Sequence, residues 1–304
     1  MKKKHLFIIV PVIVFVLLAT SALSWYKKID DAGIYIKEGH ISKKDANLSE
    51  KALQNAVKKF QSVHDSYIKD SDAKVYYALI PDKNYYLAQG DKNYTYDYNE
   101  LYSYMEQNLP NMTYIEIKDL LSQDDYYFTD THWRQEKILD VAQRLASSMG
   151  VTLEAQYEEK TLDTPFEGVY FKYLGFITGA DTIQYLDHEM FSSCTIINHE
   201  KQKEMDMYDM QLASEDNPYE MFLSGTLPVI TIENPNATTD KELVIFRDSF
   251  GSSLAPLLVE GYSKITLLDI RYMHESLIPN FVEFTNQDVL FIYNTTVINN
   301  RTSF

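Results

Sequence analysis

Cysteine, glycine and proline are scarce in this 304-residue sequence, which holds one, ten and nine of them respectively. The single cysteine, Cys194, excludes an internal disulfide, and we interpret it as a small buried hydrophobic residue rather than a catalytic thiol. The few glycines and prolines exclude collagen-like and low-complexity chains and predict mostly regular structure. The length fits one large domain or two ordinary ones.

Positive charge is also scarce. Lysine and arginine number 28 against 44 acidic residues, a net charge of −16. The first 28 residues hold no acid and five of the lysines, namely Lys2, Lys3, Lys4, Lys27 and Lys28. Residues 29–304 therefore hold 23 basic and 44 acidic residues, a charge of −21. A body this acidic repels phosphate backbones, so nucleic acid is disfavoured as a partner.

One long uncharged run is present, the 18 residues Leu6–Leu23. As a helix it would be about 27 Å long at ~1.5 Å per residue, enough to cross most of a hydrocarbon core ~30 Å thick. The preceding lysines and the following Trp25-Tyr26 are typical of the two membrane interfaces. We therefore predict a cytoplasmic tail and signal anchor over residues 1–28. A cleaved signal peptide, with Thr20 and Ala22 near its cleavage site, is the alternative.

In either case the body is expected outside the cytoplasmic membrane. Residues 29–46 are mixed and charged and are interpreted as a short stem. Residues 47–304 are expected to form the catalytic domain. Within it, apolar residues recur at helical spacing in some segments and form short continuous runs in others. They predict helices over 48–69, 98–109, 138–149, 252–259 and 276–284, and strands over 74–80, 113–117, 243–246, 265–268 and 289–293.

Alternating strands and helices, with strands that are apolar throughout, predict an α/β fold with a parallel sheet covered on both faces. Residues 151–242 differ from this pattern. Their first part, 151–220, holds 15 acidic and 4 basic residues and no long helical period. We interpret 151–242 as an irregular, partly β insertion.

Two segments contain residues suited to chemistry. The first is Tyr127–Trp133, directly before a predicted helix. Asp130 and His132 lie two residues apart in it, so the carboxylate can accept a hydrogen bond from one imidazole nitrogen while the other nitrogen faces a substrate. The alternative interpretation is a surface loop in which the aspartate or a threonine caps the next helix.

The second segment is Phe246–Gly251, which runs from an apolar strand into a helix. A serine at the carboxyl end of a parallel strand lies where open α/β sheets bind ligands. The N–H groups of the following helix point back toward Ser249 and could stabilise an oxyanion, and Gly251 permits a tight turn and close substrate approach. The alternative is that Asp248 or Ser249 only caps that helix.

Ser249, His132 and Asp130 together supply the hydroxyl, base and acid that nucleophilic catalysis needs. His274, which follows a predicted strand, is the strongest rival base. The sequence has no HExxH, CxxC, Walker or dinucleotide glycine motif, so we expect neither a metal nor an organic cofactor. The acidic pairs Asp124-Asp125 and Glu158-Glu159 are interpreted as solvated faces.

These segments resemble a known group of proteins. TDTHW at Thr129–Trp133, followed by RDSFG at Arg247–Gly251, is similar to the paired motifs of the SGNH-hydrolase-like DHHW and AlgJ–AlgX family of polysaccharide O-acetyltransferase-like proteins. Leu79–Lys83 resembles the family's strand-Pro-Asp-Lys segment, and Asp269–Tyr272 its Asp-x-Arg-Tyr segment. Thr131 departs from the DHHW pattern, which has a histidine there.

The resemblance implies an SGNH-hydrolase-like sheet flanked by helices. It implies Ser249 as nucleophile, His132 as base and Asp130 as the acid that orients it. Arg271 and Tyr272 would lie near the substrate or the oxyanion.

The expected activity is that of a membrane-anchored, extracytoplasmic O-acetyl- or O-acyltransferase acting on an envelope or secreted polysaccharide. An MBOAT-type membrane protein would donate the acyl group, and the acceptor would bind the domain itself. The alternatives are a carbohydrate esterase with the same three residues, a non-catalytic accessory protein of polymer export, and a DltD-like role in teichoic acid D-alanylation.

Overall fold

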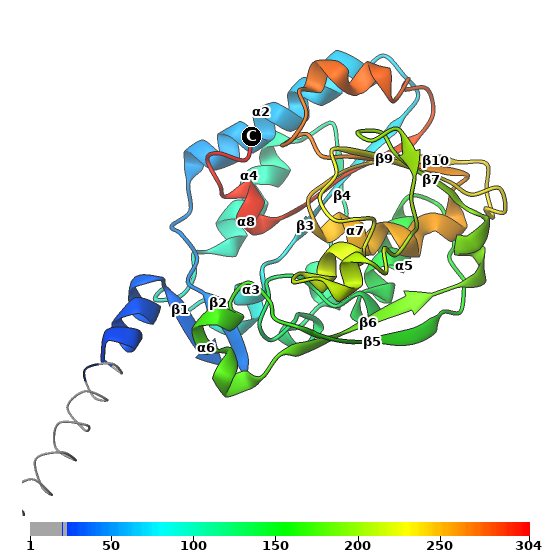
Figure 1. The fold of residues 1–304 in the computed structure, drawn as a ribbon. Helices are drawn as coiled ribbons and strands as arrows, with labels where there is room; N and C mark the ends of the chain where they lie inside the picture. The colour runs from blue at the N-terminus through cyan, green and yellow to red at the C-terminus, as the bar shows by residue number, and fades with distance from the viewer. Residues whose placement is uncertain (1–19, 21–22) are drawn as a thin grey trace, which may run out of the picture.

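The centre of the computed structural model, which describes residue 20 and residues 23–304, is an eight-stranded mixed sheet (Figure 1). Five neighbouring strands are parallel, in the order β4 (Thr113–Tyr114), β3 (Lys74–Ile80), β12 (Asp288–Asn294), β10 (Glu242–Arg247) and β11 (Lys264–Leu268). Three antiparallel strands continue the sheet, in the order β9 (Val229–Glu233), β7 (Thr195–Asn198) and β8 (Lys203–Glu204).

The parallel strands are buried on both faces, which explains their continuous apolar sequences. All seven residues of β12 are buried, and six of the seven in β3. Helices α2 (Glu50–Val63) and α4 (Tyr98–Asn108) cover one face, and α5 (Leu139–Ser148) and α7 (Phe250–Leu254) cover the other (Figure 1). A separate hydrophobic cluster fills the space on each side of the sheet.

The expected parallel sheet is confirmed for β4, β3, β12, β10 and β11, and three antiparallel strands extend it. Strands β9, β7 and β8 all come from residues 151–242, the segment interpreted as an insertion. Strands β7 and β8 have only four and two residues, and both residues of β8 are exposed, so their pattern is weaker than that of the buried parallel strands. Strand β9 is as long as β11 and is buried at four of its five residues, a signal that the interpretation of 151–242 as irregular missed. The same segment also forms a separate antiparallel pair, β5 (Glu158–Phe166) and β6 (Asp181–Asp187), with α6 (Phe171–Thr178) between them.

Two expected helices are shorter than the sequence pattern indicated. The stretch 276–284 is only a 3-10 turn over Glu275–Asn280, which contains Pro279. The helix expected over 252–259 begins at Phe250, and after Leu254 it tightens into a 3-10 segment that starts at Ala255-Pro256. Proline lacks the N–H that an α-helix interior needs, so both changes have a local cause.

Residues interpreted as a stem form an ordered hairpin, β1 (Ile34–Lys37) and β2 (His40–Lys43), after a helical stretch over residues 23–31. The Ile41 N–H donates to the Phe128 carbonyl at 2.8 Å, so the hairpin packs on the loop that precedes Asp130. Most of the predicted anchor lies outside the described residues. No helix within those described residues is both long and apolar enough to span a bilayer.

Candidate active site

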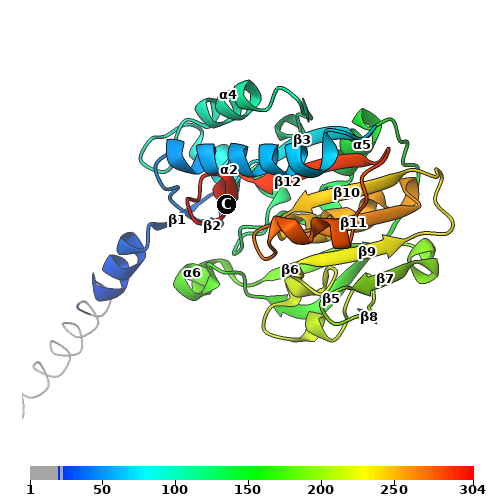
Figure 2. The ribbon, with the colours of Figure 1, turned by 90° about the horizontal axis from the view of Figure 1, so that it is seen from above.

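The two motif segments meet at the carboxyl edge of the parallel strands. Ser249 lies two residues after the end of β10, and β10 lies between β11 and β12 in the sheet (Figure 2). Asp130 and His132 lie on a loop closed at its base by a bridge between Tyr126 and Trp133. This loop, residues 126–133, is called the His loop below, and residues 247–251 the Ser turn.

A continuous chain of hydrogen bonds joins the three residues that the motifs singled out. His132 Nδ1 lies 2.6 Å from Asp130 Oδ1, and His132 Nε2 lies 2.7 Å from Ser249 Oγ. A carboxylate only accepts, so Nδ1 carries the proton and Nε2 is free to accept from the serine hydroxyl. The Asp130 side chain is 3% exposed and that of His132 is 16% exposed, so solvent reaches the imidazole.

Asp130 is held as a carboxylate. Burial alone would raise its pKa, but His132 and the N–H groups of His132 and Val169 outweigh burial and lower the pKa to about 2. The Val169 N–H donates to Oδ2 at 2.8 Å and the His132 N–H to Oδ1 at 2.9 Å. Both oxygens therefore have fixed donors, and the carboxylate is oriented as well as charged.

Aromatic rings hold the imidazole on two sides. Tyr219 stacks on His132 with ring centres 4.1 Å apart, and Phe250 is tilted against it at 4.7 Å. The Tyr219 hydroxyl lies 2.9 Å from Ser253 Oγ, which also accepts from Trp133 Nε1 at 2.8 Å. Because Ser253 is in α7, the His loop and the helix after Ser249 are linked directly.

Two buried charged side chains support the backbone of the His loop. Lys83, at the start of α3 (Lys83–Ala88), donates to the Asp130 carbonyl at 2.6 Å and to the Tyr127 carbonyl at 3.2 Å. Asp181 accepts from the Phe128 and Thr129 N–H groups at 2.8 and 2.7 Å. Burial lowers the pKa of Lys83 to about 8, although Asp82, Asp130 and Asp181 partly offset that effect.

A glycine permits the close approach of another segment to the His loop. A Cβ on Gly168 would lie 2.4 Å from the Asp130 Cβ and 2.5 Å from the Thr129 carbonyl oxygen, which no side chain tolerates. The Gly168 N–H donates to Thr129 Oγ1 at 3.0 Å. Only glycine lets the chain pass here and place the next N–H, that of Val169, on Asp130.

The Ser turn is organised by Asp248. Its carboxylate accepts from the Phe250 N–H at 3.0 Å and from the Asn294 N–H at the end of β12 at 2.6 Å. Burial raises the pKa of Asp248 above 3.8, against the lowering effect of Arg271 and these donors. The side chain of Ser249 makes no capping bond to α7, so of the two capping alternatives Asp248 does this work and the serine hydroxyl points to His132.

The structure gives Gly251 a packing role. A Cβ on Gly251 would lie 2.6 Å from the Arg247 Cβ, and the Gly251 N–H donates to the Asp248 carbonyl at 3.1 Å. The Phe250 and Gly251 N–H groups are thus already used inside the turn. A contact between Gly251 and substrate stays a prediction.

A role for Arg271 and Tyr272 near the substrate or the oxyanion stays a prediction, although Arg271 lies close enough to Asp248 to lower the pKa of that carboxyl. Arg271 forms a two-point ion pair with buried Asp269, at 2.9 and 2.6 Å, and stacks on the 63% exposed Tyr272. Among the described residues, no hydrogen bond joins Arg271 to Ser249 or His132. The rival base His274 is bonded to Ser276 at 2.8 Å and caps a 3-10 turn.

In the part of the chain that the structure describes, no group of three His, Cys, Asp or Glu side chains is placed to hold a metal ion. Cys194, expected to be buried, is half-buried, and burial raises the pKa of its thiol to about 11. The thiol is therefore protonated at neutral pH and a poor nucleophile.

Sequence reasoning missed four residues that shape this site: Lys83, Asp181, Gly168 and Tyr219. A signal was present for two of them. Lys83 belongs to the Leu79–Lys83 segment that carried part of the resemblance, and Gly168 is one of only ten glycines. Asp181 and Tyr219 lie among many acids and tyrosines of the 151–242 segment, and nothing in the sequence separates them from their neighbours.

No protein-family model and no curated protein matches this chain. Solved structures do. A DHHW family protein from Eubacterium siraeum aligns with a TM-score of 0.70 at 20% identity, covering 89% of this chain and 92% of that one. Bacillus cereus PatB1 aligns at 0.68 and 17% identity, covering 89% and 98%. The O-acetyltransferase domain of Pseudomonas putida AlgJ aligns at 0.50 and 13%, covering 90% and 95%. The chain therefore has the fold of the DHHW and AlgJ-type proteins that its sequence motifs resemble.

Proposed function

We propose that this protein is an O-acyltransferase that moves an acyl group onto a hydroxyl of a polysaccharide through an acyl-Ser249 intermediate. The observation that carries the proposal is the hydrogen-bond chain from Asp130 through His132 to Ser249. Two neighbours in fold support it. One is an O-acetyltransferase domain, and the other, PatB1, has been solved with a sulfonyl adduct.

In the first half of the reaction the Ser249 oxygen attacks the carbonyl carbon of an acyl ester or thioester. His132 Nε2 takes the serine proton and then gives it to the leaving group. The imidazolium that forms between these steps is stabilised by ionised Asp130, whose pKa of about 2 keeps it charged. The product is an ester on Ser249.

In the second half an acceptor hydroxyl occupies the place of the leaving group. His132 removes its proton, the acceptor oxygen attacks the acyl-serine carbon, and Ser249 leaves with the proton. Water in the same place would give hydrolysis, so acceptor binding decides between a transferase and an esterase. A sugar held against the exposed edge of His132 favours transfer.

The proposal also includes attachment of the domain to a membrane. Residues 1–28 would anchor the domain on the extracytoplasmic side, where an MBOAT-type protein could supply acyl groups. Trp25 packs on Phe176 of α6 at 5.2 Å, and Phe176 is 74% exposed. An exposed aromatic side chain beside the predicted anchor suits a membrane interface, which supports this placement.

The test follows p-nitrophenyl acetate with the full-length protein in detergent, with and without oligosaccharide acceptors. Release of p-nitrophenol and mass gain on Ser249 and on the sugar are measured together. Acyl gain on the sugar is the expected result, and Ser249→Ala should lower turnover about a thousandfold or more. Thermal unfolding should be nearly unchanged in that variant.

Other outcomes separate the alternatives. Release of acetate with no gain on any sugar would favour the esterase. An inert wild-type protein, or undiminished turnover by Ser249→Ala, would contradict the acyl-serine mechanism. Ser252→Ala, three residues further along in α7, serves as a matched control for loss of a hydroxyl, because its hydroxyl bonds the Gly225 carbonyl and not His132.

A further inference from the structure

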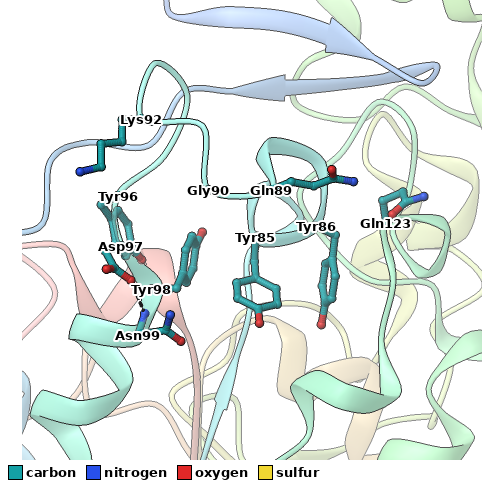
Figure 3. A pocket seen from close by; sticks show the side chains of 10 residues that line it. All are labelled: Tyr85, Tyr86, Gln89, Gly90, Lys92, Tyr96, Asp97, Tyr98, Asn99 and Gln123. Atoms are coloured by element: carbon teal, nitrogen blue, oxygen red, sulfur yellow. Dashed lines mark hydrogen bonds between the residues drawn. The ribbon is translucent and has the colours of Figure 1, made fainter.

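A cavity separate from Ser249 and His132 lies on the side of the domain formed by α3 and the start of α4. Its volume is about 520 Å³, within the ~300–1,000 Å³ usual for small-ligand sites. Four tyrosines line it: Tyr85 and Tyr86 from α3, and Tyr96 and Tyr98 from the segment that leads into α4 (Figure 3). The cavity holds none of the triad residues.

The four rings support one another. Tyr85 meets Tyr86 at a right angle with ring centres 4.9 Å apart, and Tyr98 edge-on at 5.2 Å. Tyr96 stacks on Tyr98 at 4.4 Å. The hydroxyl of Tyr86 donates to the Lys118 carbonyl, and that of Tyr98 to Asp45. These two hydroxyls are therefore bonded within the protein, while Tyr85, Tyr86 and Tyr96 remain only partly buried.

Amide side chains complete the cavity. Gln89, Asn99 and Gln123 lie at its border, and each amide can both donate and accept hydrogen bonds (Figure 3). A pyranose ring has an apolar C–H face and a rim of hydroxyls. Rigid aromatic faces flanked by amides match both parts of such a ring.

The charges of the cavity and of the whole chain favour neutral sugars over acidic ones. The cavity is lined by one cation, Lys92, and one anion, Asp97, which balance each other. The chain as a whole has a net charge of −16, so a polyuronate would be repelled on approach. A neutral or N-acetylated sugar meets no such penalty.

The cavity is connected to the His loop. Helix α3 begins at Lys83, whose ammonium group holds the Asp130 carbonyl. Tyr96 also lines a neighbouring cavity of about 540 Å³, which reaches Thr131, between Asp130 and His132. One unit of a polymer can occupy the tyrosine-lined cavity while another unit of the same polymer reaches Ser249.

We propose that the cavity lined by Tyr85, Tyr86, Tyr96 and Tyr98 binds one unit of a neutral polysaccharide, at a distance along the chain from the unit that is acylated. The inference rests on the proposed function, because it names the class of acceptor. It predicts that acceptor affinity rises with chain length and that acidic glycans bind poorly.

Binding is measured by calorimetry with the full-length Ser249→Ala protein, which separates glycan binding from acyl transfer. The probes are N-acetylglucosamine oligomers and cello-oligosaccharides of two to eight units, with oligoglucuronates as the acidic series. We expect at least one neutral series to bind with affinity that increases with length. Tyr85→Ala should weaken the longest oligomer about tenfold and leave the shortest unchanged.

Tyr104→Ala is the matched control, because Tyr104 is a half-buried tyrosine of α4 outside the cavity. Asn99→Ala, at an exposed position, gives a second cavity variant that does not depend on tolerance of a ring deletion, and it should weaken binding severalfold. Tighter binding of oligoglucuronates, or equal binding by the Tyr85 and Asn99 variants and by the control, would overturn the proposal. Neither result depends on whether wild-type protein forms acyl-Ser249.

Discussion

The His loop and the Ser turn supply one site but are held in different ways. The Ser turn depends on the parallel strands: β10 ends at Arg247, Asp248 accepts from Phe250, and the adjacent strand β12 supplies the Asn294 N–H, 46 residues along the chain. The His loop depends on side chains from outside those strands. Lys83 lies 47 residues before Asp130, and Asp181 lies 52 residues after Thr129.

The difference shows that the serine proposed as nucleophile is positioned by sheet geometry, whereas the histidine proposed as its base has a dedicated support. Asp181 and Gly168 both come from the acidic 151–242 segment. That segment therefore supports the His loop without supplying any of the three residues Asp130, His132 and Ser249. Variants that distinguish the two loops test this interpretation.

The largest effect is expected for Asp130→Asn. An amide can donate to His132 Nδ1, which would leave the proton on Nε2 and block acceptance from Ser249. Turnover should fall by roughly a thousandfold or more, as in triads that lose the orienting carboxylate. Steady-state ester cleavage measures it, with Asp163→Asn on exposed β5 as the control for the same chemical change. Equal rates for the two variants would remove Asp130 from the mechanism.

A smaller effect is expected for Asp181→Asn. Whichever carboxylate oxygen is replaced by NH2, that group would face a backbone N–H, that of Phe128 or that of Thr129, donor to donor. The free energy of unfolding should fall by about 1–3 kcal/mol, the usual result of an unpaired buried group, and turnover by about tenfold. Asp187→Asn, at the other end of β6, is the control and should change turnover little. If both variants behave alike, the His loop does not depend on Asp181.

The smallest expected effect concerns pH: the contributions of Asp130 and Asp248 to stability should change in opposite directions as the pH rises. The pKa of Asp130 falls to about 2 from 3.8, so its stabilisation is present above about pH 4 and is lost as the pH falls toward 2. Burial raises the pKa of Asp248 above 3.8, so its contribution is present at low pH and is lost as the pH rises through that raised value.

Thermal unfolding from pH 2 to neutral checks this on both asparagine variants. The deficit of Asp130→Asn relative to wild type should shrink toward low pH, and that of Asp248→Asn should shrink toward neutral pH. Parallel curves for the two variants would contradict the opposite signs. Asp163→Asn again gives the baseline.

Much of the parallel part of the sheet could be predicted from the sequence, because β3, β10 and β12 are buried on both faces and each contains a continuous apolar run. The antiparallel strands β7 and β8 could not. Strand β7 is four residues long and β8 two, and they lie in a segment dominated by acidic side chains. Short strands at a sheet edge bury little surface, so their hydrophobic pattern is weak.

The candidate site divides in the same way. Ser249 could be predicted because it lies between an apolar strand and a helix, which is a local sequence pattern. Asp130 and His132 were found because two-residue spacing brings a carboxylate to an imidazole. Their support by Lys83, Asp181 and Gly168 depends on contacts between segments far apart in the chain, and no local pattern encodes such contacts.

The indole N–H of Trp133 and the hydroxyl of Tyr219 both hydrogen-bond to Ser253 Oγ, in the helix that starts beside Ser249. These two hydrogen bonds, rather than contacts across the whole sheet, therefore help to fix the distance from the His132 imidazole to Ser249. Strands β7 and β8, at the far edge of the sheet, could move without changing that distance. The protein could flex to admit a bulky polymer while its proton-transfer path stays assembled.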